Sequence, residues 1–443
     1  MNSKGLGEEL PPFSRQEALV EANRCLYCYD APCIHACPTH IDIPRFIKKI
    51  ATDNLVGSAR TILEANLLGA TCARVCPVQE LCEGACVLGK DHAPIHIGRL
   101  QRYAMDETQG RDLVKRAPLT DKCVAVVGSG PAGLSCAGEL ARRGHQVTVF
   151  EKRELAGGLS TYGIIALREP IEASLEEVRM LERLGVRLET GAELGAKLSL
   201  DDLRQRFDAV FLGLGLGATP GMGIPGEERI LDGLAYIEQS KLDPSGMVIG
   251  KDVVVIGAGN TAIDCATIAK RLGAARVTMV YRRSENEMTA YPHELDFIRR
   301  EGVEFRFLTQ PVRVLSENGQ VSALACVPMK LGAPDASGRR TAEVSDGHEF
   351  LISSDQVVKA IGQEKPALAQ ALGLAIDRGF VKVSAEFETS VHGVFAGGDC
   401  IRAKNIASTV MAVQDGKMAA AAIHMRLTMA AAAIHRRLEE NNG

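Results

Sequence analysis

The stretch Lys122-Cys-Val-Ala-Val-Val-Gly-Ser-Gly-Pro-Ala-Gly133 predicts the fold of the largest part of this chain. A short apolar run of buried-strand type leads into a turn with glycines at positions 128, 130 and 133, and a helical pattern follows to Arg143. In such a turn Gly128 permits a tight bend, Gly130 lets the backbone approach a pyrophosphate, and Gly133 lets helix and strand pack closely. The free N–H groups at the helix start, near Ala132, favour a phosphate.

A second apolar run, Val147 to Phe150, ends on Glu151 and Lys152. A carboxylate at the end of this strand is positioned for the ribose hydroxyls of a dinucleotide. The glycine motif alone would be weak evidence. Framed by strand, helix, strand and a terminal acid, it predicts a site for a flavin or nicotinamide dinucleotide.

Composition limits the possible functions. A chain of 443 residues is expected to form two or three domains, and its net charge of −4 argues against a general nucleic-acid or anionic-membrane surface. Met1 to Leu10 shows no secretory pattern, and charged residues and histidines interrupt the alanine-rich tail, so no membrane span is expected. We therefore expect a cytoplasmic protein.

The thirteen cysteines are distributed unevenly, because eight lie between Cys25 and Cys86. In a cytoplasmic chain such a cluster favours metal over disulfides. The eight form two runs, each with a Cys-Pro pair, and soft thiolates suit iron–sulfur clusters or zinc. Zinc is the weaker alternative, since a Cys-x2-Cys pair occurs only once, and a disulfide scaffold is weaker still. The other five cysteines are expected in the core.

A second dinucleotide motif begins at the apolar run Asp252–Ile256 and continues as Gly257-Ala-Gly259-Asn260-Thr261-Ala262. The following strand ends on Arg282 and Arg283, where the first motif has its acid. Guanidinium groups pair with a phosphate, so they favour the 2′-phosphate of NADP(H) over NAD(H). The alternative is that both arginines merely point into solvent.

Two further glycine-rich segments fit a flavin. Gly158 and Leu159 lie in a turn suited to the approach of a ring system, and Gly393–Asp399 delivers Gly398 and Asp399 at the end of an apolar strand. A helix is expected over Asn405–Lys417. Beyond it, Met418–Leu427 recurs as Met429–Leu438, a period of about three turns that predicts a lengthened C-terminal helix.

The segment Cys25 to Arg102 resembles the N-terminal domain of dihydropyrimidine dehydrogenase, which is shared with the glutamate synthase small subunit. The resemblance implies two [4Fe–4S] clusters and their ligands. The first cluster would take Cys25, Cys28, Cys33 and Cys86; the second would take Cys37, Cys76, Cys82 and Gln101. Gln101 ends the run Pro94-Ile-His-Ile-Gly-Arg-Leu-Gln101, which matches the dihydropyrimidine dehydrogenases. The family does not use the position of Cys72 as a ligand.

The resemblance also implies a role for Arg168, which in this family lies between flavin and cluster. Arg168 and Pro170 match the family pattern, whereas Ile165 and Leu167 replace its proline and phenylalanine. The local packing is therefore expected to differ, while the cofactor is retained.

Together these patterns predict a multidomain fold with one α-helical domain and two α/β Rossmann-like domains. The helical iron–sulfur domain would span residues 1–118, and the FAD-binding domain would span 119–235 and 355–443. The NAD(P)H-binding domain, at 236–354, would be inserted into the FAD-binding domain.

The predicted function is electron input. NAD(P)H would give a hydride to flavin N5, and single electrons would leave through the two clusters, because a flavin can exchange both. No catalytic acid or base is required on this chain. A flavin disulfide reductase is disfavoured, since no redox Cys-x-x-Cys is available outside the cluster runs. A structural flavoprotein without enzymatic activity is the non-enzyme alternative.

The family resemblance implies a hetero-oligomer with a partner that completes the reaction. No pyrimidine-binding barrel is found in the sequence, so the expected partner is the FMN-containing catalytic subunit of a dihydropyrimidine dehydrogenase that converts uracil or thymine to the dihydro forms. Gln101 and the run Asn405–Lys417 favour this interpretation. The alternatives are a glutamate synthase large subunit and ferredoxin in a transhydrogenase.

Overall fold

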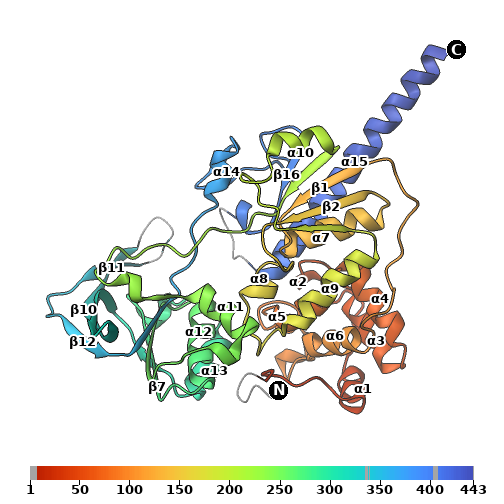
Figure 1. Ribbon diagram of the computed structural model, residues 1–443. Helices are drawn as coiled ribbons and strands as arrows, with labels where there is room; N and C mark the ends of the chain where they lie inside the picture. The colour runs from red at the N-terminus through yellow and green to blue at the C-terminus, as the bar shows by residue number, and fades with distance from the viewer. Residues whose placement is uncertain (1–6, 335–337, 339, 403–407, 443) are drawn as a thin grey trace. The chain divides into compact units, whose positions relative to one another are not determined.

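The computed structural model describes residues 7–334, 338, 340–402 and 408–442, of which 430–442 are described by their backbone alone (Figure 1). The chain forms two compact units. The first unit consists of Leu10–Thr161, Ile171–Leu216 and Lys365–Gly443, and the second of Met1–Glu9, Tyr162–Pro170 and Gly217–Glu364.

The first unit opens with a group of short helices that carries the cysteine runs. Local signals in the sequence set their starts: Ser14 and Glu17 form a capping box, and Asp42 and Asn54 cap two later helices. Their apolar faces enclose a core that includes Phe46 and Ile62. The helices are α1 (Arg15–Asn23), α2 (Pro32–Ala36), α3 (Ile43–Ala51), α4 (Leu55–Ala65), α5 (Gly69–Val75) and α6 (Ile97–Asp106).

The first unit also contains a five-stranded parallel sheet, in the order β16-β4-β1-β2-β3, and the helices that pack on it. Its central strands are buried on both faces, as their continuous apolar sequence predicts. The strands are β1 (Cys123–Val127), β2 (Gln146–Glu151), β3 (Arg187–Thr190), β4 (Ala209–Leu212) and β16 (Val394–Ala396). The main helices are α7 (Pro131–Arg142), α9 (Ile171–Arg183), α10 (Leu200–Arg206) and α15 (Thr409–Asn442), with short α8 (Leu159–Tyr162) and α14 (Ala367–Ala371).

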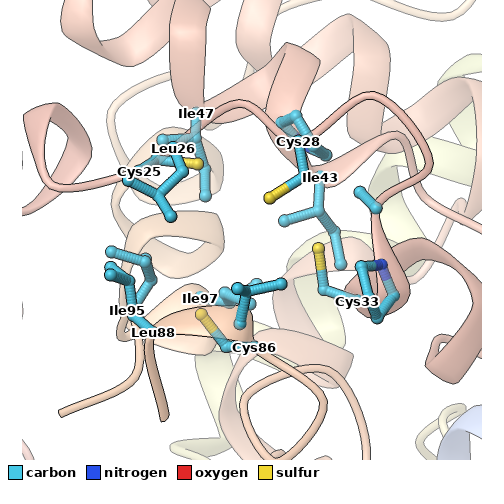
Figure 2. A pocket seen from close by; sticks show the side chains of 14 residues that line it. Cys25, Leu26, Cys28, Cys33, Ile43, Ile47, Cys86, Leu88, Ile95 and Ile97 are labelled. Carbon is cyan, nitrogen blue, oxygen red and sulfur yellow. The ribbon is translucent and has the colours of Figure 1, made fainter. Parts of the chain in front are cut away.

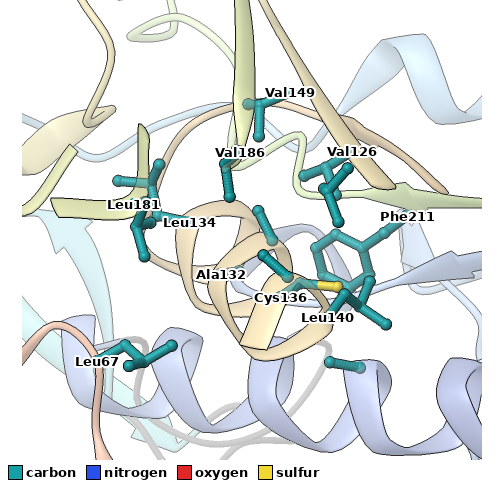
Figure 3. Packing of buried hydrophobic residues seen from close by; sticks show 14 of the residues in the cluster. Leu67, Val126, Ala132, Leu134, Cys136, Leu140, Val149, Leu181, Val186 and Phe211 are labelled. Atoms are coloured by element: carbon teal, nitrogen blue, oxygen red, sulfur yellow. The ribbon is translucent and has the colours of Figure 1, made fainter. Parts of the chain in front are cut away.

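Helix α7 packs closely on its neighbours. Leu67 and Phe211 lie beside its apolar residues, among them Cys136 (Figure 3). Gly416 of α15 lies directly against α7, since a Cβ there would be 2.1 Å from the carbonyl oxygen of Ala132. No larger residue fits at position 416 unless the two helices separate.

Helix α15 runs through both copies of the eleven-residue repeat, so the predicted lengthened helix is confirmed. Ile423 and Leu427, in the first copy, are buried in the core, whereas Met425 and Met429 are exposed. The start of the predicted helix, Asn405 to Ala407, lies outside the described residues. Within the part of the chain that the structure describes, no helix has the length and apolar character needed to cross a membrane.

The second unit contains another parallel sheet, in the order β5-β13-β6-β7-β8. Its strands are β5 (Leu231–Asp232), β6 (Asp252–Ile256), β7 (Arg276–Val280), β8 (Glu304–Arg306) and β13 (Gln356–Lys359). Its helices are α11 (Gly233–Leu242), α12 (Asn260–Arg271) and α13 (Pro292–Arg300). Strands β9 (Thr309–Glu317), β10 (Gln320–Pro334), β11 (Arg340–Val344) and β12 (Phe350–Ser353) add antiparallel pairs.

Several boundaries of these units differ from the sequence prediction. The sequence predicts that the inserted domain starts at residue 236, but the second unit already includes Gly217 and strand β5, which pairs with β13. The sequence predicts a return to the flavin domain at Asp355, but β13 pairs with β6 in the second unit, and the first unit resumes at Lys365. Two valines in a short buried strand predict burial but not which of two parallel sheets the strand joins. The predicted class, a helical domain with two α/β Rossmann-like folds, is confirmed.

Glu177 of α9 holds the start of α5 in place. The N-cap residue of α5 is Leu68, whose side chain cannot accept a hydrogen bond. Glu177 Oε1 instead accepts from the backbone N–H groups of Ala70 and Thr71, at 2.7 and 3.1 Å. A carboxylate from another helix thus provides the acceptor that an N-cap side chain usually supplies.

We therefore predict that Glu177→Ala destabilises the first unit by about 1–3 kcal/mol, because two buried N–H groups lose their acceptor. The measurement is thermal unfolding of the purified protein. Glu176→Ala is the matched control: Glu176 pairs with Arg179 and Arg183 near the surface, and its loss should cost less than about 1 kcal/mol. Equal destabilisation by the two variants would contradict the capping role.

Candidate cofactor sites

In the first glycine turn, two glycines are in close contact with neighbouring backbone and the third has open space beside it. Gly128 has φ +92°, and a Cβ there would lie 2.4 Å from the carbonyl oxygen of Gly213. A Cβ on Gly133 would lie 1.9 Å from the carbonyl oxygen of Gly128. Gly130, at the start of α7, has no atom within 4 Å of where its Cβ would be. The space left beside Gly130 fits the approach of a pyrophosphate.

Glu151 is fixed at the end of β2, next to this turn. Its Oε2 accepts from the backbone N–H of Ser129 at 2.9 Å and from the Ser129 hydroxyl at 2.5 Å, and its Oε1 accepts from Arg153 N at 2.9 Å. Lys152, next to it, is exposed. The structure therefore brings the predicted acid to the predicted glycines, as the strand–helix–strand pattern indicates.

The second glycine-rich turn lies on the first. Gly158 has φ +58°, and its Cβ would come within 2.6 Å of the Cα of Gly130. Gly157 N donates to the Ser129 carbonyl oxygen at 3.2 Å, and Leu159 follows with 41% of its surface exposed. Gly158 and Leu159 are thus beside the same open space as Gly130.

Gly398 and Asp399 complete this group at the end of β16. A Cβ on Gly398 would be 2.9 Å from the Cβ of Ala132, so the two flavin motifs meet there. Asp399 is mostly buried, which raises the pKa of its carboxyl, and its Oδ1 has no hydrogen-bond partner among the described residues. A buried acceptor without a donor fits a ligand hydroxyl such as those of a flavin ribityl chain.

Asp415 of α15 supports the Gly398 turn. Its Oδ2 accepts from Gly398 N at 3.0 Å and also forms an ion pair with Arg402. No sequence pattern predicts this contact, since an aspartate within a helix has no motif of its own. The hydrogen bond from Gly398 to Asp415 shows that α15 fixes the backbone beside Asp399.

Arg168 lies in the second unit, in a different setting from the other predicted flavin residues. It forms ion pairs with Asp264 of α12 and Glu294 of α13. Burial alone would lower the pKa of Arg168, but the two carboxylates raise it, so the guanidinium stays charged. The predicted position of Arg168 beside the flavin stays a prediction.

The second dinucleotide motif has the geometry expected of a nucleotide turn. Gly257 has φ +138°, and its Cβ would lie 2.2 Å from the carbonyl oxygen of Ala360. Gly259 precedes α12, and Asn260 and Thr261 form the first turn of that helix. Asn260 Oδ1 accepts from Tyr291 N at 3.3 Å. Ala262, where many such motifs have a third glycine, is fully buried.

Arg282 and Arg283 follow β7 and differ in solvent exposure and in hydrogen bonding. Arg283 is half-buried, and its Nε donates to the Arg340 carbonyl oxygen at 2.8 Å. Arg282 is exposed. Arg282 is therefore the better candidate for an incoming 2′-phosphate.

The first predicted cluster site is a hollow that is partly open to solvent. Cys25, Cys28, Cys33 and Cys86 face one another across it, with Ile43 and Ile97 among its apolar walls (Figure 2). Burial raises the pKa of the Cys33 thiol to about 12. Bound iron would compensate the charge of the thiolates.

A second hollow is lined by the other predicted set, Cys37, Cys76, Cys82 and Gln101. Gln101 Nε2 donates to the Gly69 carbonyl oxygen at 2.7 Å, which leaves its amide oxygen for the hollow. Cys72, which the sequence left without a role, lines the same space. All eight predicted ligands are thus gathered into the two sets that the resemblance implies, and their roles as ligands stay predictions.

The thiols of each predicted set lie around one of the two hollows. Among the described residues, no three His, Cys, Asp or Glu side chains come close enough together to hold one metal ion. The thiols instead surround a hollow, as ligands of a larger iron–sulfur group do.

Two family models match the chain. Residues 2–113 match dihydropyrimidine dehydrogenase domain II, 4Fe-4S cluster, and residues 122–416 match pyridine nucleotide-disulphide oxidoreductase. The chain belongs to the pyridine nucleotide-disulphide oxidoreductases. Within them, it belongs with the iron–sulfur flavoproteins that include the small chain of glutamate synthase.

Two relatives illustrate this placement, and one solved structure has a similar fold. The small chain of NADPH glutamate synthase from Halomonas elongata is 37% identical to this chain. The match covers 95% of this chain and 93% of the relative. The Escherichia coli small chain is 34% identical, with coverages of 93% and 92%. FprA from Mycobacterium tuberculosis, solved with NADPH, has a TM-score of 0.59 at 18% identity, over 72% of this chain and 86% of that chain.

The chain is therefore an oxidoreductase whose cofactors are FAD, [4Fe–4S] clusters and NAD(P)(H), as the sequence predicts. This overturns the alternative of a purely structural flavoprotein. The family name refers to disulphide chemistry, which would need a pair of redox-active cysteines. Cys136 and Cys265 do not form such a pair, because each is fully buried in the core of a different unit.

We predict that Asp399→Ala lowers the affinity for FAD about tenfold or more, because a buried hydrogen bond to the ribityl chain is lost. FAD released on dilution, followed by flavin fluorescence, measures this change. Asp399→Asn keeps an amide oxygen as acceptor and should lie between the wild type and the alanine variant. Tight FAD binding by both variants would contradict the assignment of Asp399.

We predict that Arg282→Ala raises the KM for NADPH about 10- to 100-fold, since a charge-assisted hydrogen bond to phosphate contributes about 1.5–3 kcal/mol. The KM for NADH should not change. Arg283→Ala should have the smaller effect, because Arg283 is already bound to Arg340. Steady-state reduction of an artificial acceptor provides the measurement, and an equal effect on both nucleotides would argue against phosphate recognition.

Proposed function

We propose that this protein is the electron-input subunit of a larger enzyme, and that it takes a hydride from NADPH and delivers single electrons to a partner. Bound FAD supplies the exchange between a two-electron donor and one-electron acceptors. One observation supports the proposal most strongly: a single helix, α15, lines the second hollow with Val410 and fixes the flavin motif at Gly398 with Asp415.

The residues of α15 hold these two sites in a fixed relation. Lys417 Nζ donates to the carbonyl oxygens of Thr39, at 3.1 Å, and Ala65, at 2.8 Å. Thr39 follows Cys37, and Ala65 ends α4, so Lys417 ties the helix to the wall of the second hollow. Such fixed spacing suits electron transfer, which needs orientation rather than acid–base groups.

The relatives favour a glutamate synthase large subunit as the partner. Both bacterial small chains match over nearly their whole length, and each is named as one part of NADPH glutamate synthase. By analogy, this chain would supply electrons for glutamate formation from glutamine and 2-oxoglutarate. The sequence offers this partner as one of two alternatives to the pyrimidine interpretation, and the comparisons support it better than that interpretation.

A dihydropyrimidine dehydrogenase catalytic subunit is the second candidate. Gln101 favours it, since an amide ligand in the run Pro94–Gln101 matches that branch, and the amide lines the second hollow. In either case we propose a cytoplasmic hetero-oligomer in which NADPH is preferred over NADH because Arg282 is exposed at the end of β7.

The test begins with the full chain purified without air. We expect a brown protein that contains FAD and the iron and sulfide of two clusters, and that is bleached by NADPH. Added large-subunit candidates are then assayed separately with glutamine plus 2-oxoglutarate and with uracil or thymine. Activity with only one pair identifies the partner. A protein that contains zinc, or whose flavin is not bleached by NADPH, would overturn the proposal.

We also predict that Cys82→Ala abolishes electron delivery to a one-electron acceptor while NADPH still bleaches the flavin, because one cluster loses a ligand. Stopped-flow absorbance separates the two steps. Cys326→Ala is the matched control, since this thiol is fully buried in β10, outside both hollows. Normal delivery by Cys82→Ala would remove Cys82 from the electron route.

A further inference from the structure

Asn66 is a buried polar residue in the wall of the second hollow that the proposed function does not use. It follows the last residue of α4 and has only 1% of its surface exposed. It lines the same space as the predicted ligands Cys37, Cys76, Cys82 and Gln101.

A backbone contact determines the orientation of the Asn66 amide. Leu68 N donates to Asn66 Oδ1 at 2.9 Å. Since a backbone N–H can only donate, the atom that it reaches must be the oxygen, and the other end of the amide is the NH2 group. Nδ2 is buried, and it has no hydrogen-bond partner within the described part of the chain.

The other polar side chains of this wall are already engaged. The Thr39 hydroxyl lies 3.4 Å from Cys37 Sγ, and Gln101 Nε2 donates to the Gly69 carbonyl oxygen. Among the side-chain nitrogen and oxygen atoms that the structure describes around the hollow, Asn66 Nδ2 is the one that is buried without a hydrogen-bond partner. A buried N–H group without an acceptor destabilises a protein by about 1–3 kcal/mol. This donor therefore indicates a ligand in the hollow that accepts a hydrogen bond.

We propose that Asn66 Nδ2 donates a hydrogen bond to a sulfur of the cluster in the second hollow and raises the reduction potential of that cluster. Thiolate and sulfide sulfurs carry negative charge and accept hydrogen bonds. A donor aimed at them stabilises the additional electron of the reduced state. Asn66 is thus a positioning and tuning residue, not a ligand. The inference rests on the proposed function, because it requires a cluster at this set of residues.

Two variants test this role. Asn66→Leu keeps the size of the side chain and removes its donor, and Asn66→Ser keeps an oxygen that can accept from Leu68 N but does not extend as far into the hollow. In both, we expect the reduction equilibrium of the second cluster to shift about tenfold toward the oxidised form, which equals about 59 mV for a one-electron couple. The flavin and the first cluster should keep their potentials. The measurement is a redox titration of the full chain, followed by EPR.

Ser58→Ala is the matched control. Ser58 is fully buried in α4 as well, but its hydroxyl donates to the Phe46 carbonyl oxygen at 2.9 Å and it does not line the hollow. This variant should leave both clusters unchanged. Unaltered potentials in an Asn66 variant that retains its full iron content would overturn the inference alone, whereas a wild type without a second cluster would overturn the proposed function.

The unaltered protein provides a readout that does not depend on the folding of a variant. With ¹⁵N placed only in the side-chain amide of asparagine, pulsed EPR of the reduced second cluster should detect a coupled ¹⁵N nucleus. Gln101 is not labelled in this experiment, so it cannot supply the signal. Absence of that coupling, with the cluster present and reduced, would overturn the inference.

Discussion

The contact between α7 and α15 at Gly416 is the constraint on which the first unit depends. The glycine turn begins one of these helices, and the other follows the second flavin motif, so close packing brings distant parts of the sequence to one place. A Cβ at Gly416 would meet the backbone of α7, and Gly398 in turn lies against Ala132. The flavin site is therefore built by backbone-to-backbone approach, which only small residues allow.

The same helix reaches the iron–sulfur part of the chain. Val410 lines the second hollow, and Lys417 donates to two carbonyl groups beside it. Glu177 adds a further link, since it caps the helix that carries Cys72 and leads to Cys76. Side chains from the sheet part of the unit thus hold the loops that supply the predicted ligands, and a shift of α15 or α9 would be transmitted to them.

Local patterns in the sequence predicted the two dinucleotide turns, the helical character of the cysteine-rich domain and the cofactors that the comparisons support. These features depend on residues that lie within a few positions of one another in the sequence, such as glycines at fixed spacing, an acid at the end of a strand and a Cys-Pro pair. The sequence could not show that β13 joins the second sheet, that Arg168 pairs with Asp264 and Glu294, or that Asn66 faces the second hollow. Those contacts depend on tertiary packing between segments whose residues carry no motif.

The C-terminal helix α15 extends beyond the last of its described side chains that packs in the core. Among the described side chains of α15, contacts with the core end at Leu427, the last residue of the first copy of the repeat. A change in the number of repeats after Leu427 would therefore alter the length of the helix rather than the contacts that these described side chains make with the core.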